Sequence, residues 1–132
     1  MLPFPIELTA GAPIYEQIVE AVRRAVASGR LKEGDRFPSV RAISAELRVN
    51  PNTVQKAVTE LTSLGLLEVH PGQGCYIATR SVSTVRQQRE ALAPLLERLV
   101  IEAAHQAVDE ATLLELLRAK CRELKINLDS NS

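Results

Sequence analysis

Apolar residues recur at helical spacing through "APIYEQIVEAVRRAVASG", a pattern that predicts an amphipathic helix. Pro13 suits the first turn of this helix, and Gly29 suits a left-handed stop. Before the helix, apolar residues alternate over positions 4–8, which indicates either a short strand or a segment tucked onto the core. The inward face of the helix is expected to carry Ile14, Ile18, Val22 and Ala25.

The next apolar stripe is interrupted at Asn50 and Pro51. Ser39 suits the N-cap of a short helix, which must end by Asn50 because the residue before a proline is pushed out of helical geometry. Asn50 can then cap a second helix, with Pro51 at the first position and Gly65 at the stop. The inward residues are Val40, Ile43 and Leu47 in the short helix and Val54, Ala57, Val58 and Leu61 in the second.

After Gly65 the apolar period changes to two. The runs "LLEV" and "CYIA" flank the loop "HPGQG" and predict a β-hairpin, and the earlier "KEGDRF" predicts a turn with a very short extended piece. The fold class is therefore mainly α with a small β-hairpin. Residues 1–80 form one domain in the order helix, short helix, turn, helix and hairpin.

Residues 81–132 have a different pattern of apolar positions. It predicts two amphipathic helices, the second capped by Asp109. Pro94 lies inside the first of them and is expected to kink it without breaking it, because the apolar period continues on both sides. One helical hairpin cannot cover so many apolar side chains, so we expect a dimer interface of four helices. The alternative is that the two helices fold back onto the first domain. The expected dimerisation residues are Val85, Leu92, Leu95, Leu96, Leu99, Leu113, Leu117 and Leu124, supplemented by Val100, Ala103, Leu114, Leu116 and Leu128.

The helix after Pro51 carries hydrogen-bonding side chains along one outward ridge, at positions i, i+3, i+4 and i+7. Asn and Gln can pair bidentately with adenine, Lys can pair with guanine, and a Thr methyl can touch the thymine methyl. Every surface helix has a polar face, so the ridge alone does not indicate a function. It becomes informative in combination with the short capped helix, the tight turn and the hairpin around it. Together these features favour DNA binding by a helix-turn-helix. The ridge consists of Asn52, Gln55, Lys56 and Thr59, with Thr53 beside it in the first turn.

Two neighbouring elements supply further candidate contacts. Ser39 and Arg41, at the start of the short helix, are placed for a phosphate. The hairpin loop offers His70, Gly72 and Gln73 to a sugar-phosphate edge, although most loops of this kind bind nothing.

Composition limits the other functions that the chain could have. Net charge is zero, but positions 36–59 hold four basic residues against one acidic residue. Aromatic residues make up 3% of the chain, which argues against a stacking platform for single strands. Cys75 and Cys121 form no CxxC pair, so we expect no metal site and a reducing compartment. The sequence shows no transmembrane run, secretion signal, catalytic constellation or cofactor motif, which indicates a cytoplasmic protein that is not an enzyme.

The segment from Pro13 to Ile77 resembles the winged helix-turn-helix domain of the GntR family of bacterial transcription regulators. The shared motifs are "G-D-x-x-P-S-x-R", "V-N-P-N-T-V" and "G-L-x-x-x-x-x-G-x-G", and the short two-helix tail is similar to the YtrA subfamily. The resemblance places Arg41, Asn52, Thr53, Gln55 and Lys56 at DNA contacts and Gly72 at the wing glycine. The sequence departs from the family at the wing, where arginines are common and His70 and Gln73 stand here, and at Arg48, where a glycine is common.

The prediction is a homodimeric, sequence-specific regulator that binds a palindromic operator in double-stranded DNA. The resemblance implies repression and control of a transporter operon. The alternative is a protein-interaction module on a winged-helix scaffold, which would show no salt-sensitive binding of duplex DNA. The sequence identifies no small-molecule effector, and about fifty tail residues leave little room for a drug-sized pocket unless a dimer interface supplies one.

Overall fold

The computed structural model describes residues 1–80 and 83–131 of the chain. They fall into two units, Met1–Arg80 and Ser81–Ser132. The division expected after residue 80 borders positions 81 and 82, which lie outside the described residues, as does Ser132 at the end of the polar tail.

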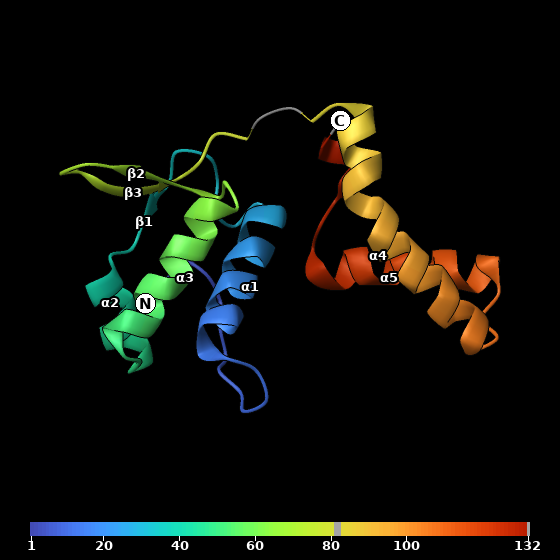
Figure 1. Ribbon diagram of the computed structural model, residues 1–132, viewed down its shortest axis with the longest axis horizontal. Helices are drawn as coiled ribbons and strands as arrows, with labels where there is room; N and C mark the ends of the chain where they lie inside the picture. Colours follow the sequence, from blue (N-terminus) through green and yellow to red (C-terminus); the bar gives the residue numbers. More distant parts are fainter. Residues whose placement is uncertain (81–82, 132) are drawn as a thin grey trace. The chain divides into compact units, whose positions relative to one another are not determined.

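Three helices and a small sheet build the first unit (Figure 1). Helix α3 lies between α1 and α2, and the sheet is antiparallel with strand order β1-β3-β2. The elements are α1 (Ile14–Ala27), β1 (Arg36–Phe37), α2 (Val40–Leu47), α3 (Pro51–Ser63), β2 (Leu67–His70) and β3 (Gly74–Ile77).

The core of this unit is an apolar cluster to which all three helices and all three strands contribute. The inward residues predicted for α3 are all buried, and Ile43 of α2 is fully buried, with Val40 and Leu47 packed at the edge. The buried side chains are Phe4, Ile18, Val19, Val22, Ala25, Leu31, Phe37, Ile43, Val54, Ala57, Val58, Leu61, Leu67 and Ile77.

One sequence prediction for the start of the chain is wrong in detail. Ile14 is 39% exposed, because it is the first residue of α1 and lies beyond the edge of the core, and Val19 is buried in addition to the predicted stripe. Of the two arrangements expected for residues 4–8, the segment tucked onto the core is the one observed, and no strand forms there. The segment is instead held by Phe4, whose buried ring stacks on Phe37 with ring centroids 5.8 Å apart.

The turn between α2 and α3 has the predicted caps. Ser39 Oγ accepts the N–H of Ala42 at 3.0 Å, and Asn50 Oδ1 accepts the N–H of Asn52 at 2.8 Å, with Pro51 at the first position of α3. Arg48 closes α2 in the left-handed region with φ of 56°. These local bonds fix where α3 begins and therefore which side chains face outward.

The predicted hairpin forms with Leu67 opposite Ile77 and His70 opposite Gly74. The short extended piece becomes β1, a third strand that pairs with β3 and sets Arg36 opposite Tyr76. Because β3 pairs with β1 on one edge and with β2 on the other, it is the central strand of the sheet. The pairing with β1 connects the hairpin to the segment that follows α1.

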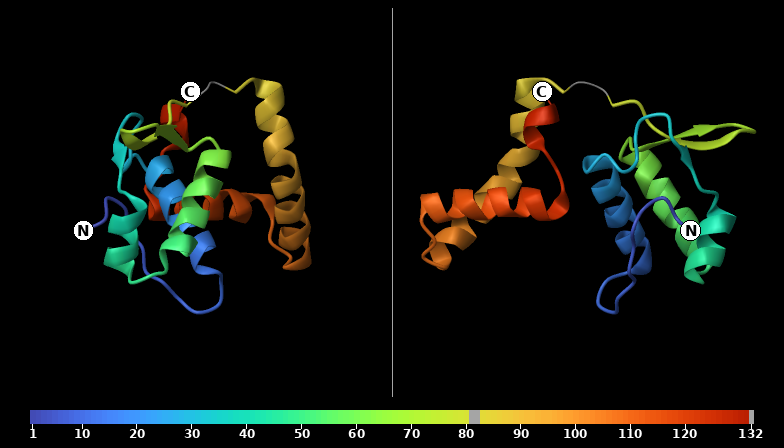
Figure 2. Two further views of the ribbon diagram at one scale, coloured as in Figure 1. Left: turned by 60° about the vertical axis from the view of Figure 1, so that its left-hand side comes forward. Right: turned by 180° about the vertical axis from the view of Figure 1, so that it is seen from behind.

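In the second unit, α4 (Val85–His105) and α5 (Glu110–Leu124) precede a short 3-10 helix, Leu128–Asn131. Thr84 and Gln87 form a reciprocal capping box at the start of α4, and α4 continues through Pro94 without a break. The two long helices meet at a turn and then diverge instead of packing along their lengths (Figure 2). No residue of α4 or α5 is buried.

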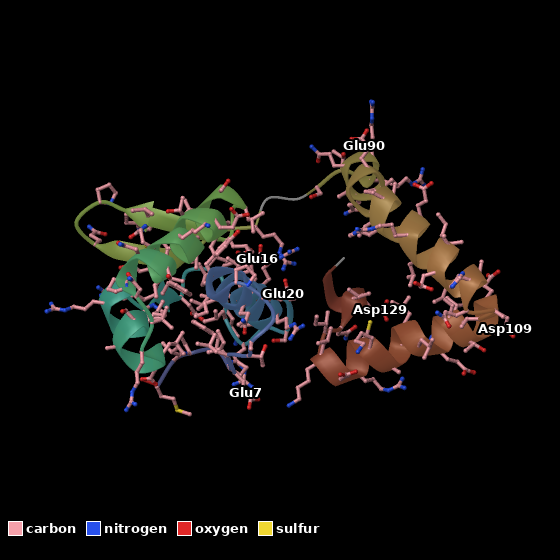
Figure 3. The ribbon with its side chains drawn as sticks, turned by 60° about the horizontal axis from the view of Figure 1, so that its bottom comes forward. Glu7, Glu16, Glu20, Glu90, Asp109 and Asp129 are labelled. Atoms are coloured by element: carbon pink, nitrogen blue, oxygen red, sulfur yellow. The ribbon has the colours of Figure 1, made fainter. Side chains whose placement is uncertain are left out.

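Asp109, labelled at the turn in Figure 3, caps α5 as predicted. Its Oδ1 accepts the N–H of Thr112 at 2.8 Å. Hydrogen bonds from the Thr112 side chain and backbone lower the pKa of the Asp109 carboxyl below its usual value. The charged carboxylate therefore stabilises the start of α5.

Replacement of Asn50 by alanine should reduce stability by about 1 kcal/mol, because it removes the oxygen that caps α3. Urea denaturation followed by helical circular dichroism measures the change. Asn50→Asp keeps a capping oxygen and should remain close to wild type. An Asn50→Ala protein as stable as wild type would contradict the role of this cap.

Replacement of Asp109 by alanine should lower the thermal midpoint of helix loss in a pH-dependent way. The folded pKa of Asp109 is lowered, so its stabilisation is complete above the ordinary value of 3.8 and disappears as pH falls through the folded pKa. The midpoint difference from wild type should therefore be constant near neutrality and shrink in acid. A difference that stays constant down to acid pH would argue against the carboxylate cap.

Candidate nucleic-acid interface

Helix α3 has one buried face and one outward polar ridge. Asn52, Gln55, Lys56 and Thr59 are exposed, and Thr53 is half-buried in the first turn. The opposite face is formed by the four buried apolar residues of the same helix. The ridge is therefore held in place by the core, while its side chains remain accessible.

The ridge side chains contact one another and α1 only lightly. Gln55 Nε2 donates to Thr59 Oγ1 at 3.4 Å, a long bond that a base edge can replace. Lys56 Nζ lies 4.0 Å from the ring centroid of Tyr15 in α1. These contacts leave the amide and ammonium groups able to bind a partner.

A shallow groove of about 660 Å³ lies between the start of α1 and the start of α3. The two helices lie side by side with their N-terminal ends at the same end of the unit (Figure 1). The Glu16 carboxylate, together with burial, a hydrogen bond from the Tyr15 hydroxyl to Glu16 and the charge of Glu60, raises the Tyr15 pKa above its usual value. The groove is lined by Pro13, Ile14, Tyr15, Asn52, Thr53 and Lys56.

The start of α2 presents two further predicted contacts, Ser39 and Arg41, both exposed. Ser39 Oγ accepts a backbone N–H as the cap of α2, so its hydroxyl hydrogen can still donate to another group. Within the described part of the chain, the Arg41 side chain forms no hydrogen bond or ion pair. A guanidinium without a partner, next to the first backbone amides of a helix, can bind a phosphate oxygen.

The hairpin tip brings together the predicted wing residues His70, Gly72 and Gln73. Gly72 has φ of 77°, a conformation that glycine adopts without strain. The His70 ring stacks on Tyr76 with centroids 4.6 Å apart, and its Nε2 lies 3.4 Å from Glu68. His70 is therefore engaged within the hairpin, whereas Gln73 is exposed at the tip.

Two residues of this surface are absent from the predicted site. Tyr15 contacts the ridge through Lys56, and Arg36 lies beside the hairpin, where a Cβ on Gly74 would come 3.6 Å from its guanidinium. Arg36 was counted in the basic surplus of positions 36–59, but its approach to Gly74 depends on the pairing of β1 with β3. The wing loop, which lacks arginine, thus has a guanidinium from another strand beside it.

The helix order, the three-stranded sheet and the outward ridge of α3 define a winged helix-turn-helix protein. Residues 14–77 match the family described as bacterial regulatory proteins, gntR family. The chain is 33% identical over 121 residues to the HTH-type transcriptional repressor YtrA of Bacillus subtilis (strain 168), covering 91% of this chain and 93% of that protein. The chain therefore belongs to the GntR family, and its resemblance to the YtrA subfamily is confirmed.

Solved structures agree with this assignment. A transcriptional antiterminator from Listeria monocytogenes EGD-e is 28% identical, with a TM-score of 0.78 over 94% of this chain and 93% of that one. The DNA-binding domain of AraR in complex with operator ORX1 is 26% identical, with a TM-score of 0.51 over 55% of this chain and 96% of that one. These relatives are transcription regulators, which confirms the prediction that the chain is not an enzyme. Within residues 1–80 and 83–131, no helix is long and apolar enough to cross a membrane.

Replacement of Arg41 by alanine should weaken binding to all duplex sequences alike, because a phosphate contact carries no sequence information. The slope of log affinity against log salt should fall by about one. Fluorescence anisotropy with several duplexes measures both quantities. Arg23→Ala is the matched control, because Arg23 lies on α1 beside Glu20, outside the predicted contacts. A loss confined to one base position would instead identify Arg41 as a base reader.

Proposed function

We propose that the protein is a homodimeric transcription repressor that binds a palindromic operator in double-stranded DNA. The observation that carries the proposal is the ridge of α3, whose hydrogen-bonding side chains face outward while the opposite face is buried. The second helix of a helix-turn-helix enters the major groove with its N-terminal residues toward the bases. The operator complex of the AraR domain and the repressor YtrA support the proposal by similarity.

The chemistry of the ridge suits base edges in the major groove. Asn52 and Gln55 supply amides for adenine, Lys56 supplies an ammonium for guanine, and Thr59 supplies a methyl for thymine. Thr53, half-buried in the first turn, lines the protein's own groove between the starts of α1 and α3. Such pairs distinguish sequences, whereas phosphate contacts set the position of the protein.

Phosphate and sugar contacts come from the flanking elements in this proposal. Ser39 and Arg41 at the start of α2 bind one strand of the backbone, and Gly72 and Gln73 of the wing approach another. Arg36 adds charge beside the wing, while His70, held by Tyr76 and Glu68, shapes the loop. Because few cations act per subunit, two subunits are needed for tight binding at physiological salt.

The second unit supplies the dimer interface in this proposal. Its large apolar side chains are about half-exposed, for example Leu96 at 53% and Leu117 at 50%. Complete burial of a leucine side chain contributes roughly 1.5–3 kcal/mol, so a face of this composition favours association. A second copy is the proposed occupant, because the first unit closes its own core. The predicted residues remain the proposed interface: Val85, Leu92, Leu95, Leu96, Leu99, Leu113, Leu117 and Leu124.

The two-fold symmetry of such a dimer matches a palindrome with half-sites about one DNA turn apart. A dimer bound there represses by blocking polymerase. The YtrA resemblance points to a transporter operon as the target, and the two lone thiols point to the cytoplasm. An effector is not part of the proposal.

Selection of bound sequences from random duplex DNA tests the operator directly. The expected result is a palindrome whose half-sites are separated by about one helical turn, with affinity that falls as salt rises. Recovery of no enriched sequence, together with the absence of salt-sensitive duplex binding, would favour the protein-interaction module instead.

The replacement Leu96→Glu should convert the dimer to a monomer, because it places a charge within the apolar face of α4. Sedimentation at micromolar concentration measures the state, and operator affinity should fall in parallel. Leu64→Glu is the matched control: Leu64 is 48% exposed but lies in the first unit, and it should remain dimeric. A monomeric wild type at this concentration would contradict the dimer proposal.

A further inference from the structure

Lys56 of α3 rests over the face of Tyr15 of α1. The ammonium nitrogen lies 4.0 Å from the ring centroid, well within the range of a cation–π interaction. Tyr15 is half-buried, and its hydroxyl donates to Glu16 Oε1 at 3.3 Å. The ring is thus fixed between its own helix and the recognition ridge, while the exposed Lys56 rests on its outer face.

An acidic residue on the same helix is the alternative partner for this lysine. Glu60 is four positions after Lys56, a spacing at which side chains of opposite charge can pair on a helix. Within the described part of the chain, however, Lys56 forms no ion pair with Glu60. Lys56 turns instead toward the start of α1, into the groove that it shares with Asn52 and Thr53.

We propose that Tyr15 is a positioning residue for DNA recognition, whose ring holds the Lys56 ammonium at the groove that Asn52 also lines, unpaired with Glu60. The inference rests on the proposed function, because it assigns Lys56 a partner in duplex DNA. A lysine has a long, mobile stem, and a ring that confines it reduces the number of rotamers lost on binding. The N–H donors of the ammonium that point away from the ring remain able to reach a base or phosphate oxygen.

The position of Lys56 can be measured without DNA. Protons over an aromatic face resonate upfield, so the ε-methylene of Lys56 should be shifted upfield in wild type. The shift should persist in Tyr15→Phe, which keeps the ring, and disappear in Tyr15→Leu. Lys32, which lies outside the groove, is the internal control. A Lys56 resonance that is ordinary in wild type would overturn the inference.

Operator affinity then tests the consequence for recognition. By fluorescence anisotropy with the selected operator, Tyr15→Leu should bind about two- to five-fold more weakly, the range expected for an exposed cation–π contact. Tyr15→Phe should bind like wild type. In a Lys56→Met background, Tyr15→Leu should have no further effect. Adding Glu60→Gln to Tyr15→Leu should recover part of the loss, because the competing carboxylate is removed.

A structural role for Tyr15 predicts different results. Equal losses in the Lys56 and Lys56→Met backgrounds would overturn the inference, since the effect would not pass through Lys56. A loss in Tyr15→Phe as large as in Tyr15→Leu would also overturn it, and would assign the effect to the hydroxyl. Failure of the wild-type protein to bind any duplex would contradict the proposed function. If the wild type binds its operator but Tyr15→Leu and Tyr15→Phe bind with equal affinity, this inference alone would be contradicted.

Discussion

The burial of one face of α3 is the constraint on which the rest of the structure depends. Val54, Ala57 and Leu61 are fully buried, so the helix cannot rotate about its axis without exposing them to water. The Asn50 cap and Pro51 at the first helical position fix its first turn. Rotation and starting point together determine which four side chains form the ridge, and the core thereby sets the surface that reads DNA in our proposal.

The two units differ in how far they bury their apolar side chains. The first unit buries Phe4, Phe37 and the inward faces of its helices within itself. The second buries none of the side chains of α4 and α5 and exposes leucines along both. A helix pair whose ends are well capped but whose apolar face is uncovered has its local structure specified by sequence, and in our proposal a second copy of the chain covers that face. This contrast is the physical basis for assigning recognition to one unit and assembly to the other.

The predictable parts of the fold are those specified by nearby residues. Ser39, Asn50 and Asp109 were identified as caps because a cap needs only an oxygen and the amides two or three positions ahead. The unpredicted parts depend on contacts between distant segments. The pairing of β1 with β3, the stacking of Phe4 on Phe37 and the approach of Arg36 to Gly74 each join segments that no local pattern connects. The contact of Tyr15 with Lys56 belongs to the same class, because a tyrosine in the first turn of a helix gives no local sign of its neighbour on another helix.

Amide chemical-shift mapping during titration with the selected operator tests the central claim most directly. The account predicts that the largest changes fall on residues 52–59, with smaller changes at the start of α2 and at His70 and residues 72–74 of the hairpin. The buried face of α3 should keep its side-chain resonances. Changes concentrated on the far end of α1 or on α4 and α5, with residues 52–59 unaffected, would show that DNA does not meet the ridge and would contradict the account.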